Sequence, residues 1–263
     1  MSELFQQAVA NTLPLLQSIE GGVKSTPKAS LAALKKLQAA AKAASPAPLM
    51  TREDKNTTPW TWSTLEKAIL SCQKCQNLVA SRTQVVFGVG NRDAELMFIG
   101  EAPGADEDKL GEPFVGRAGQ LLTKIIEAMG FTRDDIFIAN VLKCRPDMPA
   151  GESGNRKPRM DEMTTCLPWL REQIQLVKPR VMVALGATAA EGLLGETRPM
   201  RELRGQWLDF HSTPVMVTYH PAYLLRNQTI TEKRKVWEDM LLVLEKLGHP
   251  ISEKQRKFFT SAA

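Results

Sequence analysis

The sequence predicts a three-layer α/β/α sandwich with a mostly parallel, four-stranded central sheet and a poorly structured N-terminal tail. Four short apolar runs alternate along the chain with longer segments whose apolar residues recur at helical spacing. Alternation of this kind is typical of a parallel sheet that is covered by helices on both faces. The first sixty residues are rich in Ala, Lys and Pro and contain few large apolar side chains, so they cannot bury a core of their own.

Each predicted strand is a short apolar run that ends at a glycine or a polar residue. The predicted strands cover residues 95–100, 135–140, 181–186 and 214–219. Helices are predicted at 118–129, at 163–177, from Ala187 onward and at 232–247, with Gly130 and Lys178-Pro179 as stop signals. Ligands of parallel sheets bind beyond the carboxyl ends of the strands. Function is therefore expected in the four loops that follow the strands, which begin at Gly100, Asn140, Gly186 and His220.

The predicted domain boundaries follow a change in composition near Trp60. We expect a basic N-terminal extension over residues 1–60, a globular domain over 61–250 and a C-terminal tail over 251–263. Within the extension, the Lys-rich stretch 24–49 predicts either a solvated tether or a contact with DNA or a partner.

Charge and hydropathy restrict the class of protein. The formal net charge of +5 and the pI of about 9.0 favour a polyanionic partner. No apolar run is long enough to span a membrane, and the N-terminus lacks the basic start and apolar core of a secretory signal. We therefore expect a cytoplasmic protein that makes no membrane contact.

The four cysteines predict a metal site. They are Cys72, Cys75, Cys144 and Cys166, and in the cytosol they should be reduced. Four thiolates fit either a tetrahedral zinc ion or a [4Fe–4S] cluster. A single C-x-x-C pair followed by two separated cysteines is unlike a zinc ribbon and favours iron–sulfur. Cysteine nucleophilic catalysis is the weakest alternative, because no histidine or acid accompanies the thiols.

The loop after the first strand contains several carboxylates and an aromatic residue. Its glycines and proline permit tight turns in which backbone N–H groups can hold a carbonyl oxygen or a phosphate. Glu101 and Glu107 are candidates for stabilising a cation or positioning a water molecule. Phe114 is a candidate for stacking on a planar base. The alternatives are an acidic surface turn and a phenylalanine that fills the core.

The second and fourth loops supply further polar candidates. Asn140 offers both a donor and an acceptor at a strand end, although an asparagine there also commonly caps a turn. His220 can stabilise negative charge on a leaving group, although a histidine before proline is often structural. Arg226 and Asn227 suit phosphate contacts.

These segments together resemble the family 4 uracil-DNA glycosylases. The resemblance is carried by Gly100-Glu-Ala-Pro-Gly104 with Glu107-Asp108, by Pro113-Phe-Val-Gly116, by Asn140-Val-Leu-Lys-Cys-Arg-Pro146 and by His220-Pro-Ala-Tyr-Leu-Leu-Arg226. It extends from about Ser71 to about Leu247, and all four cysteines fall where that family places the ligands of its [4Fe–4S] cluster.

The resemblance implies a monofunctional glycosylase acting on uracil-containing DNA. Uracil would flip out of the helix, because its glycosidic bond is unreachable in the base stack. Phe114 would stack on the base, Asn140 would read its Watson–Crick edge, and His220 would bond O2 and stabilise the departing anion. The loop of Glu101 and Ala102 would hold the base near the sugar. Water would complete the hydrolysis and leave an abasic site, with no lysine nucleophile and no strand cleavage.

Two departures from the family pattern keep alternatives open. Residues 147–154 resemble an insertion, and the N-terminal extension lies outside the family core, where it could contact a repair or replication partner. A related group binds uracil-DNA covalently through a histidine in an inserted loop, but the insertion here has none. The alternatives are a non-catalytic or covalent uracil-DNA-binding iron–sulfur protein and a glycosylase for another base such as hypoxanthine. We expect a monomer.

Overall fold

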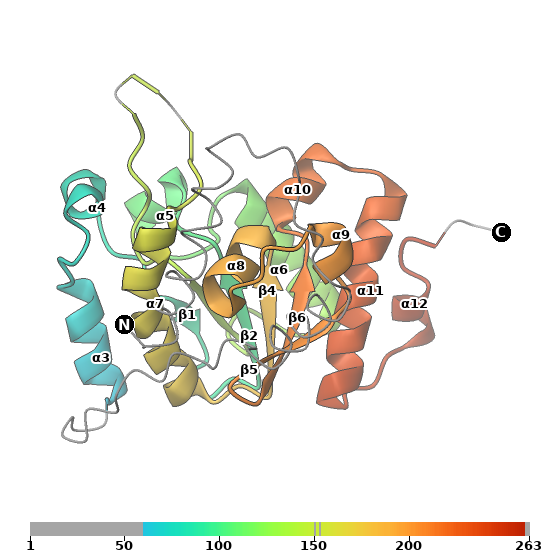
Figure 1. Ribbon diagram of the computed structural model, residues 1–263. Coiled ribbons are helices and arrows are strands. Elements are labelled where there is room, and N and C mark those ends of the chain that lie inside the picture. The colour runs from blue at the N-terminus through green and yellow to red at the C-terminus, as the bar shows by residue number, and fades with distance from the viewer. Residues whose placement is uncertain (1–59, 150, 153, 261–263) are drawn as a thin grey trace, which may run out of the picture. The chain divides into compact units, whose positions relative to one another are not determined.

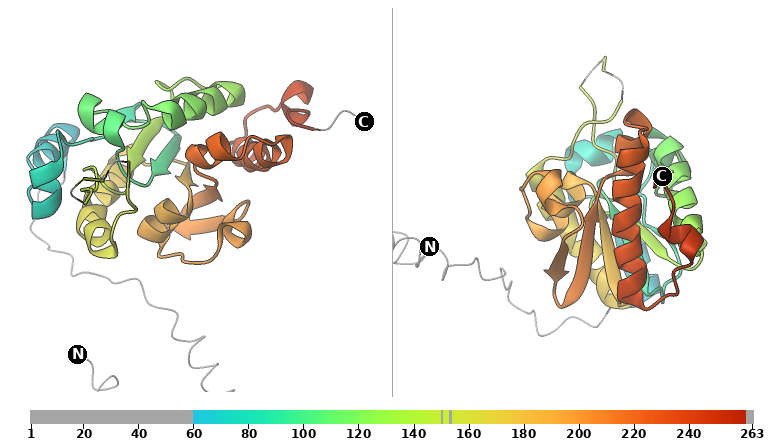
Figure 2. Two further views of the ribbon diagram at one scale, coloured as in Figure 1. Left: turned by 90° about the horizontal axis from the view of Figure 1, so that it is seen from above. Right: turned by 90° about the vertical axis from the view of Figure 1, so that its right-hand side faces the viewer.

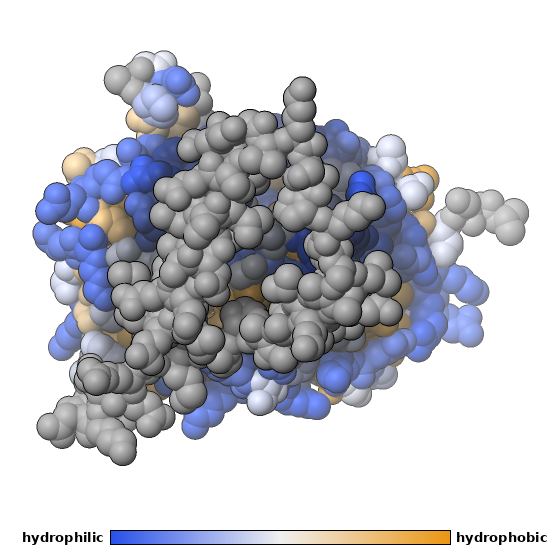
Figure 3. All heavy atoms as spheres, in the orientation of Figure 1, coloured by the Kyte–Doolittle hydropathy of each residue, from blue (hydrophilic) through white to orange (hydrophobic). Residues whose placement is uncertain are grey.

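The computed structural model describes residues 60–149, 151–152 and 154–260. The predicted N-terminal extension therefore lies, apart from Trp60, outside the described residues, and so does the end of the predicted C-terminal tail. No helix of the described part is long and apolar enough to cross a membrane. Where Figure 3 shows the surface of described residues, it is mostly hydrophilic, with apolar side chains scattered over it.

The central sheet has six strands in the order β1-β3-β2-β4-β6-β5. Its four inner strands run parallel and are those that the sequence predicts: β3 (Phe137–Asn140), β2 (Leu96–Gly100), β4 (Val181–Leu185) and β6 (Thr213–Thr218). The two edge strands, β1 (Val89–Gly90) and β5 (Trp207–Phe210), are antiparallel to their neighbours and were not predicted. The prediction of a mostly parallel α/β sheet is confirmed, with an antiparallel strand added at each edge.

Helices cover both faces of the sheet, as Figures 1 and 2 show. Side chains alternate along each strand, so β2 sends Leu96 and Phe98 into one hydrophobic core and Met97 and Ile99 into the other. The first core contains α6 (Arg117–Met129) and α11 (Ile230–Leu247). The second contains α3 (Trp62–Leu70), α7 (Met160–Val177) and α8 (Ala187–Leu194). The predicted three layers are thus present.

Five shorter helices complete the described part of the chain. They are α4 (Gln76–Ser81), α5 (Ala105–Leu110), α9 (Met200–Leu203), α10 (Pro221–Arg226) and α12 (Glu253–Arg256). Two of them, α5 and α10, directly follow strands. Helix α6 ends where predicted, because Gly130 adopts the left-handed conformation (φ 96°) that closes the helix.

The segment after α11 folds back onto that helix. Trp237 donates its indole N–H to the Gln255 carbonyl at 2.6 Å, and Arg234 donates to the Phe258 carbonyl at 2.9 Å. The Phe258 ring lies 5.2 Å from the Trp237 ring. The described part of the predicted C-terminal tail, which the sequence analysis placed outside the domain, therefore packs against it.

Candidate functional site

The predicted site residues gather at the carboxyl edge of the parallel strands. Strands β2 and β3 end side by side, with Gly100 paired to Asn140. Strands β4 and β6 end together in the same way, and Gly186 and His220 follow them. In Figure 1, helices α5, α8 and α10 begin near this edge. The alignment of strand ends thus brings residues from four distant segments of the chain to one place.

Gly100 marks the point where the first two loops meet. A Cβ atom added at this glycine would lie 2.3 Å from Oδ1 of Asn140 and 2.5 Å from Cζ of Phe114. The Phe114 ring in turn lies 5.6 Å from the His220 ring, at an interplanar angle of 30°. Asn140, Phe114 and His220, which are predicted to hold a base, therefore lie close together. Only glycine fits at position 100 next to Asn140 and Phe114.

The Asn140 side chain is available to bind a ligand. The residue is only 3% exposed, yet within the described part of the chain no hydrogen bond is found for its side-chain amide. Neither of its polar side-chain atoms is among the fully buried, unpaired ones of the described residues, so a ligand can reach the amide. A planar ligand that offers one acceptor and one donor would satisfy both ends of this amide.

His220 is held in a defined tautomer. Its Nδ1 accepts a hydrogen bond from the Ala222 N–H at 3.1 Å and caps α10. Burial lowers the pKa of His220 from its ordinary 6.5 to about 4, with help from the Arg226 charge and against the charge of Glu107. The imidazole is therefore neutral near pH 7, and its single proton is on Nε2. The ring can donate one hydrogen bond from that atom.

Glu107 joins the two loops that carry Gly104 and Phe114. One carboxylate oxygen accepts from the Gly104 N–H, and the other accepts from the N–H groups of Val115 and Gly116, each at 3.0 Å. Three backbone donors thus engage both oxygens of a side chain that the sequence analysis took as a catalytic candidate. Its contacts are those of a residue that fixes loop geometry.

The backbone of Phe114 is also held from outside its loop. The residue has a φ of 55°, which is uncommon for a bulky side chain and needs support from its surroundings. Arg133 supplies it by donating to the carbonyl oxygens of Pro113 at 2.9 Å and Phe114 at 3.2 Å. The sequence analysis missed Arg133, because nothing in its local sequence marks it as a partner of the loop.

Glu101 is a carboxylate at this edge whose side chain, unlike that of Glu107, is not bonded to backbone N–H groups of the described residues. It is partly buried, and burial raises its pKa, although Thr188 and the charge of Lys157 act in the opposite direction. Its backbone carbonyl accepts from the Leu142 N–H at 3.1 Å, which ties the first loop to the second. The adjacent Ala102 is partly buried and packs against the hydrophobic core.

Arg226 and Asn227 lie at the far end of α10. Arg226 is exposed, whereas the Asn227 amide donates to the Tyr223 carbonyl at 3.1 Å and closes the helix. Arg226 is thus presented to solvent, while the contacts of Asn227 are those of a capping residue.

The four cysteines surround a single small cavity beside the second core. Three of their sulfurs accept hydrogen bonds: Cys144 from Arg82 at 3.0 Å, Cys166 from the Lys143 N–H at 3.3 Å and Cys72 from Trp169 at 3.4 Å. Donors around sulfur are typical of sites where thiolates bind a metal or a cluster. Burial raises the pKa of the Cys166 thiol to about 12, so a buried thiolate here needs a bound cation.

The arrangement of these cysteines bears on which group they could hold. Among the described residues, no three histidine, cysteine or acidic side chains lie close enough together to hold one metal ion. The four cysteines nevertheless line one cavity, so their sulfurs could share a bound group.

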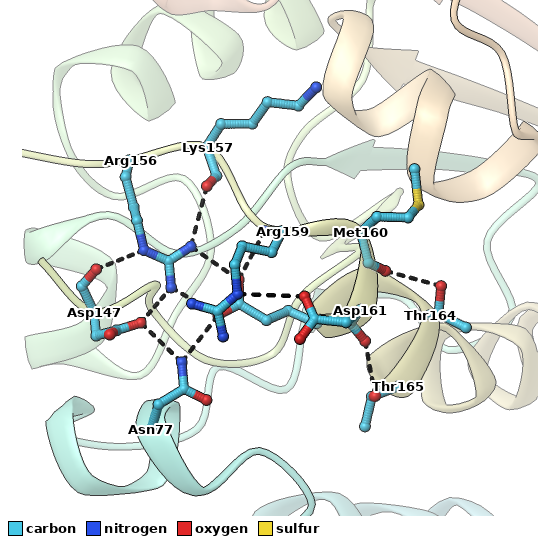
Figure 4. A network of polar contacts seen from close by, with 10 residues as sticks. Asn77, Asp147, Arg156, Lys157, Arg159, Met160, Asp161, Thr164 and Thr165 are labelled. Carbon is cyan, nitrogen blue, oxygen red and sulfur yellow. Dashed lines mark hydrogen bonds and ion pairs between the residues drawn. The ribbon is translucent and has the colours of Figure 1, made fainter. Parts of the chain in front are cut away.

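A polar network braces the base of the loop at 147–154, the predicted insertion. Glu162 is 2% exposed and accepts from Arg156 at 2.7 and 2.9 Å, from Asn77 at 3.0 Å and from the Arg159 N–H at 2.8 Å. Arg156 also pairs with Asp147, as Figure 4 shows. The network joins both stems of the loop to α4 and α7, and the loop rises from the carboxyl edge in Figure 1.

This loop also places an unforeseen side chain at the site. The Asn155 amide nitrogen lies 3.2 Å from the position of a Cβ atom at Gly104. The sequence analysis treated Asn155 only as the residue after the insertion. The C-terminal stem of the loop therefore borders the first motif.

Comparisons with known proteins agree with this geometry. The family model of the uracil DNA glycosylase superfamily matches residues 87–241. The chain is 42% identical over 178 residues to the type-4 uracil-DNA glycosylase of Thermotoga maritima, which covers 67% of this chain and 89% of that protein. It is 37% identical over 201 residues to that of Archaeoglobus fulgidus, covering 73% and 94%. With the type-4 enzyme of Sulfurisphaera tokodaii the identity is 41% over 185 residues, covering 66% and 79%.

The matched segment contains all four strand-end loops, and the relatives are matched over most of their own length. The predicted family is thereby confirmed. The chain belongs to the type-4 uracil-DNA glycosylases, within the uracil DNA glycosylase superfamily.

Proposed function

We propose that this protein removes uracil from DNA by hydrolysing the N-glycosidic bond, which leaves an abasic site and starts base excision repair. The observation that carries the proposal is the Asn140 amide, for which the described residues provide no hydrogen-bond partner and which lies beside Phe114, the neighbour of His220. The names of the relatives state the same activity for those proteins.

Recognition follows from the groups that surround Gly100. A flipped uracil would stack on the Phe114 ring, with its Watson–Crick edge toward Asn140. The amide N–H would donate to O4, and the amide oxygen would accept from N3–H. Cytosine presents a donor and an acceptor at the corresponding atoms in the reverse order, so it would leave both ends of the amide unpaired.

The chemistry follows from the tautomer of His220. As the C1′–N1 bond breaks, negative charge develops on the uracil and positive charge on the sugar. The Nε2–H of the neutral imidazole would donate to O2 and stabilise the uracil anion. Glu101 is our candidate for holding the attacking water or stabilising the sugar cation. Glu107, whose oxygens bind three N–H groups, is proposed as a positioning residue.

A lysine nucleophile is not needed for this reaction. Among the described residues, Lys143 bonds the Asn140 carbonyl, and Lys157, whose charge acts on Glu101, pairs with Glu191. We therefore expect base release without strand cleavage. Arg226, exposed at the end of α10, is proposed to contact a phosphate, and Asn227 to keep that helix end in place.

We further propose that the four cysteines hold a [4Fe–4S] cluster with a structural role. The shared cavity, the donors to sulfur and the family of the chain support it. When bound, such a cluster supplies the positive charge that keeps buried thiolates ionised, and it would fasten the segments that carry Cys72, Cys75, Cys144 and Cys166. Chemical analysis should find about four iron and four sulfide per chain. Stoichiometric zinc would contradict the assignment.

The first test is an excision assay on a DNA strand with a single uracil, compared with a strand that has thymine at the same place. Alkali treatment should cleave only the uracil strand, and omission of alkali should leave it intact. A stable protein–DNA adduct without base release would favour the covalent alternative instead. Binding with neither release nor adduct would favour a non-catalytic binding protein.

Gly100→Ala should abolish most of the activity while the protein remains folded. The new methyl group would occupy the space between Asn140 and Phe114, and displacing either group by about 1 Å is expected to lower kcat/KM by about 100-fold. Gly130→Ala is the matched control. It places a methyl group in open space at a left-handed position, so it should lose stability but keep its excision rate. Equal activity of the two variants would show that Gly100 does not border the pocket.

A further inference from the structure

Lys143 is a buried cation that none of the proposed steps uses. It is 2% exposed, and its ammonium group donates to the Asn140 carbonyl at 2.9 Å and to Oε1 of Gln173 at 2.5 Å. Gln173 is fully buried on α7, and its own N–H group donates to the Phe87 carbonyl at 2.9 Å. The amide of Gln173 is therefore fixed with its oxygen toward the lysine.

One of these bonds fixes the peptide unit that follows the proposed base-reading residue. The carbonyl of the Asn140–Val141 peptide binds the Lys143 ammonium group, and the N–H of the same peptide binds the Gly100 carbonyl at 3.0 Å. Both polar ends of the peptide are thus held, one by the strand that carries Gly100 and the other by Lys143. Without the lysine, only the N–H end would be held, and the Asn140 side chain could turn with its backbone.

The same lysine is connected to the cysteine cavity. Its backbone N–H donates to the Cys166 sulfur at 3.3 Å, the residue is one of those that line the cavity, and Cys144 follows it in the chain. Among the described residues no carboxylate pairs with Lys143, and its ammonium group bonds only the Asn140 carbonyl and the Gln173 amide. Thiolates held in the adjacent cavity would bring negative charge close to this buried group.

We propose that Lys143 is a positioning residue that couples the four-cysteine site to Asn140, so that uracil recognition depends on that site being filled. The proposal rests on the proposed function of Asn140. Lys143 touches neither the base nor the sugar in this arrangement, and it acts through the Asn140–Val141 peptide.

Lys143→Met tests the coupling, because methionine keeps most of the length and removes the ammonium group. Single-turnover excision should slow by about 10- to 100-fold, while DNA binding is unchanged. Iron should also be lost to a chelator faster than from the wild type. The matched control is Gln173→Leu, which removes the other partner of the ammonium group but leaves the bond to Asn140. It should retain excision, even where its stability falls as much as that of Lys143→Met. Wild-type excision and iron retention in Lys143→Met would overturn the proposal.

A measurement on the wild-type protein decides the question if Lys143→Met does not fold. Amide hydrogen exchange is compared before and after iron is removed with a chelator. Val141 and Leu142, whose N–H groups bond to the first loop, should exchange faster in the iron-free protein, while strand β4 stays protected. Unchanged protection of the two amides would refute the coupling. If the wild type releases no uracil at all, the proposed function fails, but the exchange and iron-release results still decide whether the two sites are coupled.

Discussion

His220→Ala is expected to slow uracil excision by about 100- to 1,000-fold, which is the usual effect of removing one donor from a developing anion. The affinity for uracil-DNA should change little, because phosphate contacts supply most of it. The variant also loses the cap of α10, since Nδ1 of His220 accepts from the Ala222 N–H. Single-turnover kinetics measures the excision rate, and a binding titration measures the affinity for uracil-DNA.

Two further variants separate capping from chemistry. Asparagine is a good helix cap but lacks the Nε2–H donor, so His220→Asn should restore stability and remain slow. His211→Asn, on the turn between β5 and β6, should excise at the wild-type rate, because asparagine tolerates the left-handed backbone there (φ 49°). Recovery of excision in His220→Asn would mean that the histidine serves only to place α10.

The lowered pKa of His220 also predicts a pH dependence. The folded state holds this pKa at about 4, whereas the ordinary value is 6.5. Between these values the unfolded chain binds more protons than the folded one, so acidification through this window removes stability. His220→Ala should therefore lose less stability than the wild type as the pH falls from neutral toward 4. When the excision rate is measured as a function of pH, His220 should contribute no titration step near neutral pH.

The parallel sheet and its strand-end loops could be predicted because their signal is local. Strand β2 is buried throughout and is apolar up to Gly100, and the breaks in the pattern placed Asn140 and His220 at strand ends. Strands β1 and β5 could not be predicted, because β1 has only two residues and β5 has four, interrupted by the exposed Asp209, so neither gives a distinctive apolar run. Edge strands are defined by the neighbour they pair with, which lies elsewhere in the chain.

Other features depend on contacts between distant segments. The acidic loop makes Glu107 a catalytic candidate, whereas its contacts with the backbone of the Phe114 loop are visible only in the structure. Arg133 and Lys143 support the site through hydrogen bonds to backbone carbonyl oxygens. Every residue has such an oxygen, so no sequence motif indicates which one a side chain will bind. The sequence around Lys143 contains one indication of its role. A lysine that lies within an apolar run beside a cysteine costs free energy to bury unless its charge has a partner.

Asn140→Asp is expected to reduce uracil excision by about 100- to 1,000-fold and to narrow the preference for uracil over cytosine by at least about tenfold. An ionised carboxylate has no donor for O4, and it brings a buried charge to a residue that is 3% exposed. Burial favours the protonated acid, whose O–H can donate to cytosine N3 while its other oxygen accepts from the N4 amino group. The protonated acid can also turn to serve uracil, so the change replaces the fixed hydrogen-bonding pattern of the wild-type amide with one that admits both bases. Excision of cytosine relative to the wild type should therefore rise at lower pH.

Excision from strands that differ only in uracil or cytosine measures this preference, and Asn91→Asp is the matched control. Asn91 is exposed, and its Oδ1 accepts from the Asp93 N–H at 2.9 Å, a bond that aspartate preserves. The control adds the same charge without touching the pocket, so its uracil preference should equal that of the wild type. If Asn140→Asp slows uracil release but leaves the preference unchanged, then Asn140 contributes to catalysis without reading the base. Discrimination would then depend on the shape of the space between Phe114 and Gly100, which Gly100→Ala alters independently.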